Sequence, residues 1–133
     1  MLIAAMVLGL IGGITYFVGG CTGVIVWEDG TAPWWMIMLV VIGPVGAMGA
    51  AMARTKPSMA GLVMLLAAAV ALGVGLASYT DFVETVGDPV LADLALPVHP
   101  FMGAALGLPV PLLGLVIGGM LALSSGQKTG AED

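Results

Sequence analysis

Charged residues in this chain fall into short groups that separate four long apolar stretches. These stretches are residues 1–27, 32–53, 57–80 and 100–125. Each of them reaches the ~20 residues that an α-helix needs to cross a ~30 Å hydrocarbon core. Their apolar residues run continuously and do not alternate, which favours helices over the strands of a membrane barrel. The pattern therefore predicts an all-α fold, an integral membrane four-helix bundle that occupies residues 1–133 as a single domain.

The connection between the third and fourth stretches, residues 81–99, is long enough to have structure of its own. Asp88 followed by Pro89 is typical of a helix N-terminus, and Leu91 and Leu94 recur at helical spacing after it. We therefore expect a short helix on the outer membrane surface. This outer loop either docks a partner or only covers the end of the bundle. The residues expected to carry a docking function are Phe82, Asp88, Leu91, Leu94 and His99.

Composition supports the membrane interpretation. Of the 133 residues, 60% are hydrophobic and 8% are charged, and the mean hydropathy is +1.15. Soluble domains carry about 25% charged residues. The net charge of −5, with three basic residues, argues against a nucleic-acid partner, because little is present to neutralise phosphates.

The basic residues predict the orientation. Arg54 and Lys56 separate the second and third stretches, and Lys128 lies in the tail at 126–133. Four crossings place these positions on one side, which the positive-inside rule makes cytoplasmic, together with both termini. Aromatic side chains gather near the opposite ends, at headgroup level: Trp27, Trp34, Trp35, Tyr79, Phe82 and Phe101. We expect the plasma membrane of a prokaryote as the location.

Residues 18–21 loosely resemble a bacterial lipobox, which would make Cys21 a lipidated N-terminus. No lysine or arginine precedes the first apolar stretch, as a signal peptide requires, so a plain first helix is favoured.

Small residues recur four positions apart, which places them on one face of a helix and lets two helix backbones approach closely. These predicted packing positions are Gly9, Gly13, Gly19, Gly23, Ala69, Gly73, Ala77, Gly103, Gly107, Gly114 and Gly118. The spacing leaves open whether the faces meet within one chain or between chains.

Prolines interrupt two of the predicted spans. Pro44 should free the carbonyl of Val40, and Pro109 and Pro111 should do the same in the fourth span. Broken helices can mark transport sites. An ordinary kinked helix is the favoured interpretation, since a transport site normally adds a buried polar group.

No Asp, Glu, Lys or Arg lies inside a predicted span, and no recognisable catalytic set is present. His99 with the acidic residues of the outer loop could hold a metal, although a solvated acidic loop is favoured. The ten methionines could suggest copper, but their scatter along the spans suits apolar packing better. We expect no cofactor and no enzymatic activity.

Three segments of the sequence, 6–14, 49–57 and 60–66, resemble the small four-helix membrane proteins grouped as DUF4064-like. The likeness lies in a glycine-rich first helix, a basic turn between helices two and three, and a glycine near the start of helix three. It implies a four-helix fold and no known activity.

The sequence therefore predicts a non-catalytic accessory or scaffold subunit of a membrane protein complex. Its partners would be the lipid bilayer and either other membrane subunits or a second copy of this chain. The alternative is a small oligomeric pore or transporter that uses the proline-broken second and fourth helices.

Overall fold

The computed structural model describes residues 1–26, 34–77 and 110–132. Its elements are α1 (Leu2–Val26), α2 (Trp34–Ala51), the 3-10 turn η1 (Met52–Arg54), α3 (Pro57–Ala77) and α6 (Val110–Glu132). The described residues contain no strand, so the all-α prediction is confirmed for this part of the chain. The outer loop, residues 81–99, lies outside the described residues.

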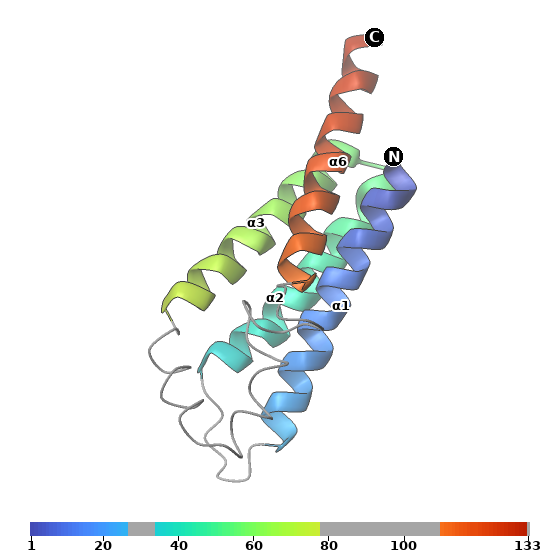
Figure 1. The fold of residues 1–133 in the computed structure, drawn as a ribbon. Helices are drawn as coiled ribbons and strands as arrows, with labels where there is room; N and C mark the ends of the chain where they lie inside the picture. The colour runs from blue at the N-terminus through green and yellow to red at the C-terminus, as the bar shows by residue number, and fades with distance from the viewer. Residues whose placement is uncertain (27–33, 78–109, 133) are drawn as a thin grey trace.

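The four helices pack side by side (Figure 1). Helix α1 lies against α2 and α6, and α3 lies against the same two helices, whereas α2 and α6 hardly touch. The helices therefore follow one another around a four-sided arrangement. Both ends of the chain and the η1 turn lie at the same end of it (Figure 1), as an even number of passes requires.

The helix bounds agree closely with the apolar stretches, except at the last helix. Helix α6 continues to Glu132, through most of the residues assigned to a tail after the fourth span. No proline or charge run interrupts residues 112–131, and a helix continues where nothing stops it. Residues 100–109, predicted as the first part of this span, are not among the described residues.

Three prolines lie within the described helices. Pro44 lies inside α2, which is continuous from Trp34 to Ala51. Pro57 is the first residue of α3, a position where the missing N–H is not needed. Pro111 falls in the first turn of α6, and the segment before it, where Pro109 and Pro111 are predicted to break the span, lies outside the described residues.

Large aliphatic side chains lie on the outside of the four helices, and the interior is built mainly from small residues. Ile3, Met48 and Leu76 are 67%, 65% and 65% exposed. Six of the larger side chains are almost completely buried: Trp35, Tyr16, Met36, Leu39, Met64 and Leu115. Each of the four helices is long and apolar enough to cross a membrane.

Candidate functional site

The contact between α1 and α2 is made by backbone atoms at two glycines. A Cβ atom placed on Gly13 would lie 2.7 Å from the carbonyl oxygen of Gly43, and one on Gly43 would lie 2.7 Å from the carbonyl oxygen of Gly13. Ordinary van der Waals contact begins at 3.4 Å. Neither helix could therefore carry a side chain here without moving away from its neighbour.

Helix α6 approaches α1 in the same way. A Cβ atom on Gly114 would lie 2.7 Å from the Leu8 carbonyl oxygen, and one on Gly118 would lie 2.9 Å from that of Ala5. From the α1 side, a Cβ atom on Gly12 would lie 2.6 Å from the Pro111 carbonyl oxygen. The adjacent glycines Gly12 and Gly13 thus serve two different neighbours, α6 and α2.

The contact between α3 and α6 repeats this arrangement. A Cβ atom on Gly61 would lie 2.7 Å from the Gly119 carbonyl oxygen, and one on Gly119 would lie 3.1 Å from that of Gly61. Sequence reasoning missed Gly12, Gly43, Gly61 and Gly119 because it sought pairs four residues apart. The glycines at positions 43, 46 and 49 could have indicated a packing face on α2, since residues three positions apart also lie on one face of a helix.

The predicted packing residues have different environments in the structure. Gly9, Gly13, Gly114 and Gly118 are buried between helices, and Gly19 is half-buried. Ala69, Gly73 and Ala77 are exposed on α3, and a Cβ atom on Gly73 would meet nothing within 4 Å. Gly23 lies in α1, and Gly103 and Gly107 are outside the described residues.

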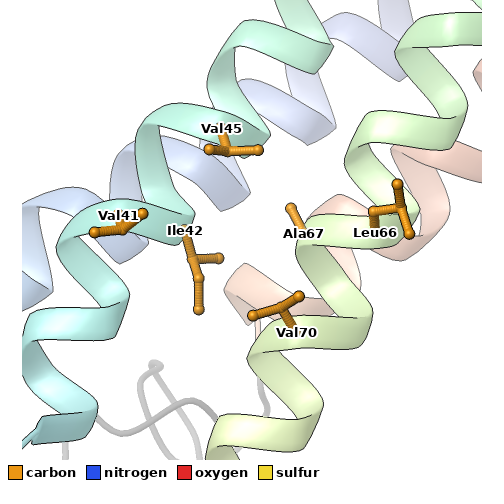
Figure 2. A pocket seen from close by; sticks show the side chains of 6 residues that line it. All are labelled: Val41, Ile42, Val45, Leu66, Ala67 and Val70. Carbon is orange, nitrogen blue, oxygen red and sulfur yellow. The ribbon is translucent and has the colours of Figure 1, made fainter.

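An aliphatic groove of ≈ 220 Å³ lies between α2 and α3. Figure 2 shows its lining: Val41, Ile42, Val45, Leu66, Ala67 and Val70. Ile42 and Ala67 form its buried floor, and the other four side chains are exposed along its sides. With only aliphatic carbon in its lining, the groove can accept an apolar group but offers nothing for catalysis.

Three hydroxyl groups in the helices donate hydrogen bonds to a carbonyl of their own helix. Thr15 Oγ1 donates to the Ile11 carbonyl oxygen at 2.6 Å, and Ser124 and Ser125 donate to that of Leu121 at 3.0 and 2.8 Å. A hydroxyl bonded in this way is tolerated in an apolar environment. Residues 1–26, 34–77 and 110–132 include no group of three His, Cys, Asp or Glu side chains that could hold a metal.

Two predicted interfacial tryptophans have different environments. Trp34 is 43% exposed at the start of α2, whereas Trp35 is fully buried. Trp35 therefore packs inside the helices and is not an open headgroup contact. The other predicted interfacial aromatics, Trp27, Tyr79, Phe82 and Phe101, lie outside the described residues, as do the docking residues Asp88, Leu91, Leu94 and His99.

The basic residues lie at the end of the molecule that carries η1. Arg54, Lys56 and Lys128 are all exposed. The turn that presents Arg54 and Lys56 is closed by the carbonyl oxygen of Met52, which accepts the backbone N–H groups of Thr55 at 3.1 Å and Lys56 at 2.9 Å. These hydrogen bonds hold the two basic residues directly before α3.

No protein-family model matches the sequence, and no curated protein or solved structure is similar to it. The resemblance to DUF4064-like proteins therefore stays a prediction.

Proposed function

We propose that this chain is an integral membrane protein that crosses the bilayer four times and acts as a non-catalytic accessory or scaffold subunit. The observation that carries this proposal is the distribution of side-chain size. Large aliphatic side chains face outward on all four helices, while glycine and alanine bring the backbones together inside. Such an exterior is unfavourable in water and favourable in lipid.

Helix length supports the same conclusion. Helices α1 and α3 have 25 and 21 residues, and each would extend about 30–38 Å at 1.5 Å per residue. The hydrocarbon core is about 30 Å thick. In this proposal the end with Arg54, Lys56 and Lys128 faces the cytoplasm, as the positive-inside rule requires, in the plasma membrane of a prokaryote.

The outward face of α3 is the proposed contact surface for an apolar transmembrane helix of another subunit. The small residues of α1 and α6 are occupied within the chain, whereas Ala69, Gly73 and Ala77 are exposed. Val70 and Leu66, on the same face of α3, border the aliphatic groove. A partner helix could approach the bare backbone at Gly73 and place an aliphatic side chain into the groove.

A co-purification experiment tests this proposal. The full chain carrying Gly73→Leu should lose its partner in mild detergent while keeping its own thermal stability, because a side chain at this position has open space. Ala4→Leu, which adds the same bulk at an exposed site on α1, is the matched control and should keep the partner.

If the Gly73→Leu protein co-purifies with as much partner as the wild-type protein does, the outward face of α3 is excluded as the contact surface. A second copy of this chain as the co-purifying species, combined with ion or solute flux in vesicles, would favour the pore or transporter instead. Recovery of the chain from the soluble fraction without detergent would overturn the membrane assignment itself.

A further inference from the structure

The basic residues lie at one end of the molecule, although they belong to distant parts of the sequence. The chain has three lysine and arginine residues in total. Arg54 belongs to η1, Lys56 to the connection before α3, and Lys128 to the last turns of α6. More than seventy residues separate Lys56 from Lys128 in the sequence. All three side chains are exposed.

A close contact joins α6, which carries Lys128, to the first turn of α3, which directly follows Lys56. A Cβ atom on Gly126 would lie 2.9 Å from the backbone nitrogen of Ser58 and 3.3 Å from its Cα atom. Lys128 follows Gly126 by two residues, and Lys56 precedes Ser58 by two. Both lysines therefore lie close to this contact along the chain, Lys128 after it in α6 and Lys56 before it, and Arg54 lies in the turn that precedes Lys56.

The surroundings of this basic cluster, Arg54, Lys56 and Lys128, are amphipathic. Within the described residues, Glu132, four residues after Lys128 in α6, is the only Asp or Glu, so the three basic side chains outnumber the carboxylates of these segments. Met59 and Leu62, in the first two turns of α3, are 52% and 55% exposed. Positive charge thus borders an exposed apolar helix face, which is the pattern that an amphiphile with an anionic head requires.

We propose that Arg54, Lys56 and Lys128 together bind the phosphate of an anionic phospholipid in the cytoplasmic leaflet. Its acyl chains would lie along Met59 and Leu62. This inference rests on the proposed membrane location of the chain. The ammonium groups supply charge, and the Arg54 guanidinium supplies paired N–H donors that match phosphate oxygens. A free phosphate ion would use the charge but would leave the adjoining apolar face unused.

Native mass spectrometry of the purified full chain, released from bilayers that contain both lipids, tests the proposal. The chain should retain phosphatidylglycerol in preference to phosphatidylcholine. Removing one basic charge should lower this preference about fivefold, the factor expected for the attraction of one basic side chain to an anionic membrane surface. The Lys56→Gln/Lys128→Gln protein should therefore lose most of the preference for phosphatidylglycerol. Lys56→Arg/Lys128→Arg, the charge-conserving control, should keep it.

Equal retention of phosphatidylglycerol by the Gln and the wild-type proteins would overturn the headgroup site while leaving the membrane assignment intact. Displacement of the lipid by excess inorganic phosphate would also overturn it, because the anion alone would then suffice. Recovery of the wild-type chain from the soluble fraction without detergent would instead refute the membrane location, and with it this inference.

Discussion

Replacing the paired glycines of the α1–α2 contact with alanine should push these two helices apart. With a Cβ atom on Gly13 or Gly43, the nearest carbonyl oxygen of the other helix is 2.7 Å away, against 3.4 Å for the closest ordinary contact. The backbone nitrogens of Ala47 and Phe17 would be closer still, at 2.5 Å from a Cβ atom on Gly13 and on Gly43 respectively, so the helices must separate by about 0.9 Å for either single substitution, the difference from 3.4 Å. Both partners at this point are backbone atoms, which cannot rotate away as a flexible side chain would.

The size of the effect follows from two opposing contributions. Alanine is a better helix former than glycine by about 1 kcal/mol. Overpacking a close contact costs about 1–3 kcal/mol. Gly13→Ala should therefore lower the free energy of unfolding by up to about 2 kcal/mol. Gly73→Ala, whose new methyl group meets nothing within 4 Å, should not be destabilising at all.

Unfolding of the two purified variants in mixed micelles, driven by increasing amounts of a denaturing detergent, measures this difference directly. The comparison is internal, because each variant replaces one glycine with alanine in an apolar helix. Equal stability of the Gly13→Ala and Gly73→Ala proteins would refute the claim that the α1–α2 contact depends on bare backbone at this position.

Three further predictions address α2, the topology and α6. Pro44→Ala should raise the free energy of unfolding by about 1–3 kcal/mol, because it supplies the N–H that α2 lacks at this point; lower stability in chemical unfolding would contradict this. In a Cys21→Ser background, a membrane-impermeant thiol reagent should modify Thr55→Cys from the cytoplasmic side and Thr85→Cys from the opposite side; labelling of both from one side would exclude four crossings. Gly118→Leu should lower thermal stability by several degrees through its clash with α1, and an unchanged melting temperature in detergent would show that α6 can repack.

The sequence predicts the helices well because the signal for them is local. Long uncharged stretches predict α1, α2 and α3 to within a few residues, since a span depends only on hydropathy and length. The sequence does not predict which helices pack against one another. A repeat such as Ala69, Gly73 and Ala77 looks the same in the sequence as Gly114 and Gly118, yet the first is exposed and the second is buried against α1.

The physical reason is that small residues permit close approach without specifying which helix approaches. Gly12 and Gly13 illustrate this, because one contacts α6 and the other α2, a division that no spacing rule along α1 alone predicts. The positions of the basic residues relative to one another also depend on which helices pack together. Lys56 and Lys128 lie near the contact of Gly126 with Ser58, which joins segments that are far apart in the chain.

The contact of α1 with α6 has a consequence for how the protein is made. The ribosome makes α1 before α6, and the glycine face of α1 at Gly9 and Gly12 contacts α6. The face of α3 at Gly61 also waits for α6, through Gly119. A nascent chain that ends at Ala77 therefore leaves both faces uncovered. Synthesis of α6 covers both faces together, so the packing of α1 and the packing of α3 are completed in the same step.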